Sequence, residues 1–247
     1  MLRFVEKPHL PQGRVRRLIL SEKYKLVLEN ALLQHIIEPI WLKKNDFVDE
    51  RLSGHCDLMA AHLGNNVLAV QESIVGDCEN IHNIELIKIP APTKPEYPHD
   101  AALNFCIVGD KLIYNPKTAD ASVINRLKLN LLACRQGYTK CSVCVVDEAS
   151  IITADNKIAQ IAMSAGMSVL YVKEDLAALD GFEHGFIGGA SFKISRNEMA
   201  FTGVINDAGE KHRIESFLNE RGISAVYLTL ERLFDIGSAI PIIEEID

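Results

Sequence analysis

The feature that constrains the fold most is an internal repeat. Four stretches share a small or polar opening, an apolar run, a tight turn and a second apolar run, and they cover residues 54–73, 97–115, 138–155 and 185–203. Their equivalent positions, His55, His99, Cys141 and Gly185, are 44, 42 and 44 residues apart. Two short apolar runs joined by a turn with Gly, Asn or Asp are typical of β-hairpins. The period therefore predicts a fold built from repeated supersecondary units.

A helix and a third strand are expected after most of these hairpins. Helical patterns cover residues 120–136, 155–165 and 209–221, each followed by a glycine, and a weaker one covers 74–82. Glycine directly after a periodic segment is a common helix stop, and Asp155 is a good N-cap. Apolar runs at 168–172 and 224–229 then predict third strands. The predicted unit is strand, strand, helix, strand.

The two ends of the chain supply the parts of one more unit. Residues 235–243 offer a first strand, whereas residues 16–20, 22–34 and 36–41 offer a second strand, a helix and a third strand. The sequence thus predicts an α/β fold of five pseudo-symmetric ββαβ units, in which the N-terminal and C-terminal segments close a ring. At 247 residues and 48% hydrophobic content the chain can bury a large core, and we expect a single domain over residues 1–247.

Charge and hydropathy exclude several classes of partner. The net charge is −7, and the basic run at residues 14–17 is the longest, which argues against binding to nucleic acid or an anionic membrane. Apolar stretches fall short of the roughly 20 residues that a membrane helix needs. We therefore expect a cytoplasmic protein with a small-molecule ligand.

The six cysteines predict reduced thiols rather than a disulfide framework, since the chain is long and shows no secretory signal. Cys141 and Cys144 have CxxC spacing, but a second CxxC or a His pair that would complete a zinc site is missing. We expect neither a metal nor a cofactor. Valines flank Cys144, so a place in the core is one interpretation of that residue.

The amino-acid sequences of the repeats resemble those of a known superfamily. The stretches "YPHDAALNF", "GYTKCSVCVVDEASIIT", "GFIGGAS" and "DIGSAIP" look similar to the pentein fold of the guanidino-group modifying enzymes, and most closely to an uncharacterised bacterial family of that fold. The superfamily includes deiminases, dimethylarginine hydrolases and amidinotransferases. The resemblance implies an α/β propeller of five units around a pseudo-fivefold axis. It does not by itself imply an activity, because one fold supports many functions.

Hydrolysis of a guanidinium C–N bond needs a thiolate to attack the central carbon, a His to move protons and carboxylates to hold the planar cation. If the units are in the superfamily's usual order, Asp235, Gly237 and Ser238 occupy the place of the nucleophile. That register leaves Asp57 and Asp100 as acids that bind a cation, without a Cys–His pair. It predicts a ligand-binding protein.

A circularly permuted register restores the chemistry. "GHCD" at residues 54–57 resembles the Gly-His-x-Asp of agmatine deiminases, which implies that His55 is the acid and base and that Asp57 holds the cation. The cysteine expected two units later is then Cys144 or Cys141. This alternative predicts a C–N hydrolase or deiminase of guanidino compounds with Cys144, His55 and Asp57 as catalytic residues. A third possibility is a scaffold that only presents surfaces, although an RNA role would need a basic face.

The openings of the first strands supply the candidate ligand-binding residues. Because side chains alternate along a strand, His55 and Asp57 should point to the same side of the first strand. A β-bulge in another unit would shift this alternation by one residue. Two glycines within a strand pattern mark a bulge or a close approach of backbone. The candidates are Asp57, His99, Asp100, Asn104, Cys141, Ser142, Gly188, Gly189, Asp235 and Ser238. Structural roles are the alternative for His55, as a hydrogen-bonded His at a strand start, and for Asp100, as a turn cap.

Overall fold

The computed structural model describes residues 1–246. Three sheets in it have the same three-stranded topology, in which the first two strands are antiparallel and the last two are parallel. They consist of β4 (Ala60–Gly64), β5 (Val67–Gln71) and β6 (Glu85–Ile89); β7 (Cys106–Val108), β8 (Lys111–Tyr114) and β9 (Asn130–Ala133); and β10 (Val143–Asp147), β11 (Ser150–Thr153) and β12 (Ser168–Tyr171). We call each such set of three strands a trio.

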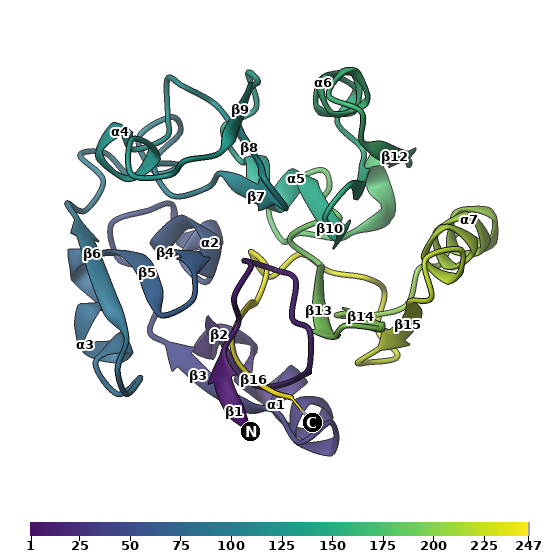
Figure 1. Ribbon diagram of the computed structural model, residues 1–247, viewed down its shortest axis with the longest axis horizontal. Coiled ribbons are helices and arrows are strands. Elements are labelled where there is room, and N and C mark those ends of the chain that lie inside the picture. Colours follow the sequence, from purple (N-terminus) through teal and green to yellow (C-terminus); the bar gives the residue numbers. More distant parts are fainter. Residues whose placement is uncertain (247) are drawn as a thin grey trace.

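A larger sheet of seven strands contains two more trios with the same pairing. One is β13 (Ser191–Ser195), β14 (Glu198–Phe201) and β15 (Ser224–Tyr227), and the other is β16 (Ile240–Glu245), β2 (Arg14–Ser21) and β3 (Glu38–Leu42). The short strand β1 (Leu2–Phe4) pairs with β16 at the edge. The β16–β2 pairing joins the two ends of the chain, and Figure 1 shows the termini close together.

Helices connect the second and third strands of the trios. They are α1 (Lys25–Gln34) after the 3₁₀ turn η1 (Glu22–Tyr24), α3 (Val75–Cys78) after η3 (Glu72–Ile74), α4 (Ala121–Ile124), α6 (Asn156–Ser164) and α7 (Ala208–Asn219). Asp155 and Asp207 cap α6 and α7 by accepting backbone N–H groups of the first turn. The helices lie at the periphery, with the strands closer to the centre (Figure 1). Within residues 1–246, the helices lack the length and apolar character needed to cross a membrane.

The predicted helix over residues 120–136 is wrong in its extent. The helix α4 ends at Ile124, and residues 130–133 form β9, which pairs in parallel with β8. The leucines at 127, 129 and 131 alternate with Lys128 and Asn130, and a period of two belongs to a strand. The predicted helices at 155–165 and 209–221 are confirmed, as are the third strands at 168–172 and 224–229.

The openings of the trios also differ from the prediction. Single helical turns, α2 (Cys56–Met59) and α5 (Thr139–Ser142), precede β4 and β10, where the sequence predicted extended strand. The candidate residues in these openings therefore do not alternate between two faces as strand residues do. Before β16 the chain is irregular, and Gly237 and Ser238 both have positive φ. The remaining short helical turns are η2 (Glu50–Leu52) and η4 (Glu174–Leu176).

The hydrophobic core is divided among neighbouring trios. One cluster joins β10–β12 to β13–β15 through residues such as Cys144, Ile152 and Phe201, all of which are buried. Another joins β16, β2 and β3 to β4–β6 through residues such as Ile19 and Val70. The apolar side chains thus fill the spaces between trios, whereas the openings that precede their first strands carry the buried polar residues.

Candidate functional site

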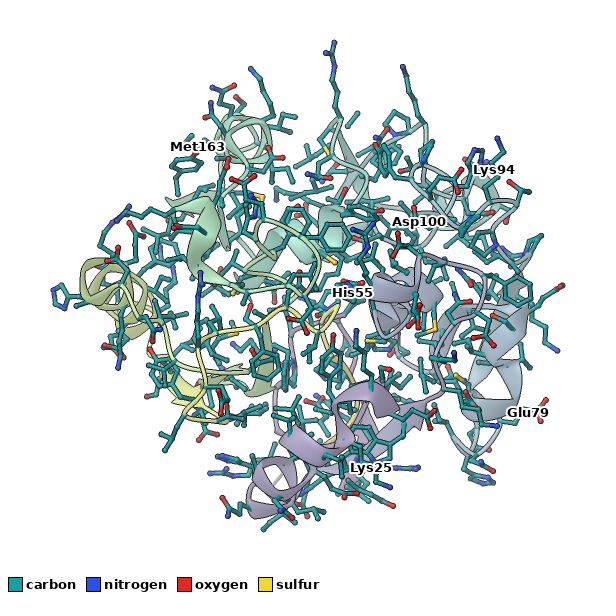
Figure 2. All side chains as sticks on the ribbon, turned by 180° about the vertical axis from the view of Figure 1, so that it is seen from behind. Lys25, His55, Glu79, Lys94, Asp100 and Met163 are labelled. Atoms are coloured by element: carbon teal, nitrogen blue, oxygen red, sulfur yellow. The ribbon has the colours of Figure 1, made fainter. Side chains whose placement is uncertain are left out.

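A cavity of about 250 Å³ lies where three segments of the chain meet. The first segment contains η2 and α2, the second is the start of α5, and the third is the loop of residues 179–186. The cavity is lined by Leu52, His55, Leu58, Tyr138, Cys141, Leu179, Phe182, Glu183, His184 and Phe186. His55 lies near the middle of the molecule, away from the periphery where Lys25, Glu79 and Met163 are found (Figure 2).

A thiol, an imidazole and a carboxylate come together at this cavity. The Sγ of Cys141, a ring nitrogen of His55 and a carboxylate oxygen of Asp235 all lie within 4.8 Å of one another, and the three residues are buried. The Nε2 of His55 is buried without a hydrogen-bond partner among the described residues. Sulfur, nitrogen and oxygen ligands in this arrangement can also hold a divalent cation such as Zn²⁺.

The backbone fixes the carboxylate of Asp235. One of its oxygens accepts the N–H of Gly237 and the other accepts the N–H of Phe186, both at 2.8 Å. A Cβ at Gly189 would overlap this carboxylate, and a Cβ at Gly237 would overlap His55. Glycine is therefore required at both positions, and the close approach expected from the Gly188-Gly189 pair is present.

Asp57 lies against the thiol. The S–H of Cys141 donates to Oδ2 of Asp57 at 2.8 Å, and Nδ2 of Asn104 donates to the sulfur at 3.4 Å. Asn104 also accepts the backbone N–H of Lys140 at 2.7 Å, which ties the start of α5 to the preceding unit. The second oxygen of Asp57 is buried without a hydrogen-bond partner among the described residues.

Burial controls the protonation of these groups. Desolvation raises the pKa of Asp57 to about 7, although Lys140 and the Cys141 hydrogen bond oppose the shift. Desolvation also raises the pKa of the Cys141 thiol well above its usual value, and the charges of Asp57 and Asp235 add to that shift. The pKa of His55 is lowered by desolvation, against the opposing effect of Asp235. The resting site therefore holds a neutral thiol and a neutral imidazole.

Asp100 lies behind the aromatic wall of the cavity. Its Oδ2 accepts the hydroxyl of Tyr138 at 2.8 Å, and its Oδ1 is buried without a hydrogen-bond partner among the described residues. Desolvation raises the pKa of Asp100. Tyr138 lines the cavity, so Asp100 contributes to the site through Tyr138.

Cys144, one of the two candidate nucleophiles, lies elsewhere. It sits in β10, inside the hydrophobic cluster that joins β10–β12 to β13–β15, with its sulfur 3.9 Å from Sδ of Met199. Desolvation raises its pKa to about 11. The structure thus brings Cys141, and not Cys144, to the cavity with His55. The reason is the helical turn α5, which ends the strand alternation on which the choice of Cys144 depended.

The other candidates have mostly structural contacts. His99 is exposed and contacts Thr93, and the hydroxyl of Ser142 donates to the carbonyl of Tyr138. The carbonyl of Gly188 and the hydroxyl of Ser238 both accept hydrogen bonds from Nζ of Lys140, at 3.1 and 2.8 Å. These residues do not line the 250 Å³ cavity.

Sequence reasoning missed two kinds of residue. Lys140 is buried next to Cys141 in the sequence, and its Nζ donates to the hydroxyl of Ser238; its position inside a candidate motif was the signal that could have identified it. The loop of residues 179–186 supplies half of the cavity lining, but most of it precedes the repeat that begins at residue 185, so no repeat pattern would have marked it. His62 is also buried, and its Nε2 lies 2.8 Å from the carbonyl of Asn65.

Solved structures of an agmatine deiminase and of two amidinotransferases have the same fold as this chain. Agmatine deiminase from C. jejuni is 10% identical, with a TM-score of 0.53 over 92% of this chain and 90% of that chain. A saxitoxin-pathway amidinotransferase from Microseira wollei is 8% identical, with a TM-score of 0.57 over 94% and 92%. An inosamine-phosphate amidinotransferase from Streptomyces griseus is 9% identical, with a TM-score of 0.55 over 97% of each chain. The fold is therefore that of the pentein enzymes.

A search of curated proteins gives no match. Among protein families, the model of a family of unknown function, DUF6873, matches residues 19–240, and the chain therefore belongs to that family.

Proposed function

We propose that the protein is a thiol-dependent C–N hydrolase or transferase that acts on the planar carbon of a guanidine or amidine in a small cationic substrate. The observation that carries the proposal is the convergence of Cys141, His55 and Asp235 within 4.8 Å at a cavity. These residues come from three distant parts of the chain, and the three functional groups are those that this chemistry needs.

The resting thiol needs its substrate for activation. Asp57 and Asp235 surround Cys141 with negative charge, which opposes a thiolate and raises the pKa of the thiol. A planar cation between these carboxylates reverses the local charge and favours loss of the thiol proton. Asp57, which already accepts the S–H hydrogen bond, is placed to take that proton. A neutral compound of the same shape would not activate the thiol.

The reaction at Cys141 then has two stages, formation and breakdown of a C–S bond. The sulfur of Cys141 attacks the planar carbon, a C–S bond forms, and the electron pair of the C=N bond moves to nitrogen. One C–N bond breaks as a C=N bond re-forms, and the proton that the thiol gave to Asp57 reaches the leaving amine through His55. Water or an acceptor amine then attacks the same carbon and gives up a proton, the C–S bond breaks, and that proton returns the sulfur of Cys141 to the neutral thiol. For the hydrolase, the net reaction consumes one water and releases one amine or ammonia.

The proximity of Cys141 to His55 supports the permuted register. We infer that the five trios are the pseudo-symmetric units of a pentein propeller and that the chain forms one domain, because each trio repeats the same pairing of antiparallel and parallel strands. In this register Cys141 opens the second unit after that of His55, which is the order implied by the resemblance to agmatine deiminases.

A second candidate is a binding protein without catalysis. The observation that favours it is the neutral state of Cys141 at rest, which follows from the raised pKa of its thiol. In that case the carboxylates would hold a cationic ligand and the thiol would take no part.

Ammonia and urea release from a panel of guanidino and amidine compounds tests the proposal. We expect release by the native protein and by the Cys144→Ala variant, and none by Cys141→Ala. In parallel, Cys141 should react with 2-chloroacetamidine, which is a cation, much faster than with the neutral 2-chloroacetamide. If no compound is turned over and both reagents leave Cys141 unmodified, the enzymatic proposal is wrong.

A further inference from the structure

The walls of the cavity are apolar along its length. Leucine and aromatic side chains come from all three segments that form it: Leu52, Leu58, Tyr138, Leu179, Phe182 and Phe186. Cys141 and His55 add the reactive groups, and Glu183 and His184 add the remaining polar ones. A substrate whose planar head reaches Cys141 must therefore place the rest of its structure against hydrocarbon.

The cavity offers no cation to a substrate carboxylate. Among the described residues, none that lines it is Lys or Arg, and Glu183 would repel a negative group. Arg51 is close to the loop but is already paired with Asp49. Its guanidinium donates to both oxygens of Asp49 and to the carbonyl of Gly181 at 2.7 to 2.9 Å, and it stacks 4.3 Å from the ring centre of Phe182.

A substrate carboxylate buried in this cavity without a cationic partner would be costly. Arg51 is not free to be that partner, because it covers one face of Phe182 and holds the backbone of the loop next to the cavity. The charge of Arg51 is thus used to position an apolar wall. Breaking those contacts to bind a substrate would also leave Asp49, whose pKa Arg51 lowers to about 2, without its partner.

We infer that the substrate is a guanidine or amidine with a short uncharged alkyl or aryl substituent, and not one that carries an amino acid carboxylate. The inference rests on the proposed function and adds the class of substituent. The volume of about 250 Å³ is below the roughly 300 to 1,000 Å³ of common ligand pockets, which limits the substituent to a small group. Leu179, Phe182 and Phe186 are the specificity-determining residues.

Three alkylating probes with one reactive head test this inference. They are 2-chloroacetamidine, its N-benzyl derivative, and the derivative in which the amidine nitrogen is the side-chain nitrogen of ornithine. In each case the sulfur of Cys141 displaces chloride: a C–S bond forms, the C–Cl bond breaks, and the thiol proton leaves to the buffer. The second-order rate of Cys141 modification is measured by peptide mass spectrometry.

We expect the N-benzyl probe to react about tenfold faster than the parent, the effect of burying roughly 60 Å² of apolar surface. The ornithine probe should react more slowly than the parent. The variant Leu179→Arg should reverse this order, because it adds a cation to the wall and raises the rate with the ornithine probe about tenfold, near the low end for one charge-assisted hydrogen bond. Leu230→Arg is the matched control, since Leu230 is exposed and lies outside the cavity.

The outcomes separate the two proposals. If the parent probe modifies Cys141 selectively but the benzyl group gives no gain, the substituent inference is wrong and the proposed function stands. If the ornithine probe is fastest with the native protein, the inference is also overturned. If Cys141 reacts with none of the probes, whereas the unfolded protein reacts with all, the proposed function fails first.

Discussion

Cys141 and Cys144 are three residues apart and nearly equal in burial, with 2% and 1% of their surface exposed, yet they belong to different environments. Cys141 lies in the helical turn α5 and contacts Asp57 and Asn104. Cys144 lies in β10 and contacts Met199 within a hydrophobic cluster. Burial alone therefore does not distinguish a candidate nucleophile from a core thiol. The two thiols are distinguished by the polar groups that converge on the sulfur of Cys141.

The largest expected difference between these two thiols is in native-state alkylation. At pH 9 the cationic reagent 2-chloroacetamidine should modify Cys141 through the cavity, whereas Cys144 should react only when the core opens. Opening of a core element costs a large part of the unfolding free energy, so we expect Cys144 to react at least about a thousandfold more slowly. Peptide mass spectrometry over a time course measures both rates in one sample.

The control is the same protein unfolded in urea, in which the two thiols should react at similar rates. Equal rates in the folded protein would contradict the distinction between the α5 turn and the β10 core.

The next effect is on the pH dependence of stability, and it comes from Asp57, which contacts Cys141 but not Cys144. The pKa of Asp57 is raised to about 7 in the folded protein, whereas an unfolded Asp titrates near its ordinary value of 3.8. Between these values the folded state binds more protons than the unfolded state, so the free energy of unfolding falls as the pH rises from about 4 to 7. At pH 8 the buried carboxylate costs about 4 kcal/mol.

The isosteric variant Asp57→Asn removes this cost. Compared with the native protein, it should gain stability as the pH rises from about 4 to 8, with the smallest difference at pH 4, as measured by urea unfolding. Asp46→Asn, at an exposed position, is the control and should leave the pH profile unchanged. A parallel profile for Asp57→Asn and the native protein would show that Asp57 is not the group that titrates.

A smaller effect tests the backbone that holds the site beside Cys141. In Gly189→Ala the new Cβ overlaps the carboxylate of Asp235, so either the backbone or Asp235 must move. Overpacking of this kind typically costs about 1 to 3 kcal/mol. Gly76→Ala, in α3, has open space around its Cβ and should be neutral or slightly stabilising. Thermal unfolding distinguishes the two, and equal midpoints would show that the Gly189 contact is easily relieved.

Much of the fold could be predicted from the sequence, because the repeat and the glycine stops are local patterns. The helix at 155–165 follows from Asp155 and Gly166, and both ends are close to those observed. The candidate site was predicted in part: His55, Asp57, Asp235 and Cys141 were all candidates. The choice between Cys141 and Cys144 was not possible from the sequence, because it depends on a single helical turn that pattern reasoning took for strand.

The smallest expected effect is on Cys144 itself. Cys144→Ala removes one sulfur atom from a packed cluster in which it contacts Met199, so the free energy of unfolding should fall by about 1 kcal/mol. The loss should be the same at pH 5 and pH 8. The pKa of Cys144 is raised to about 11, and the thiol is mainly protonated in both the folded and the unfolded state throughout that range. A loss that depends on pH between 5 and 8 would contradict this, because it would mean that Cys144 interacts with a titrating group as Cys141 does with Asp57.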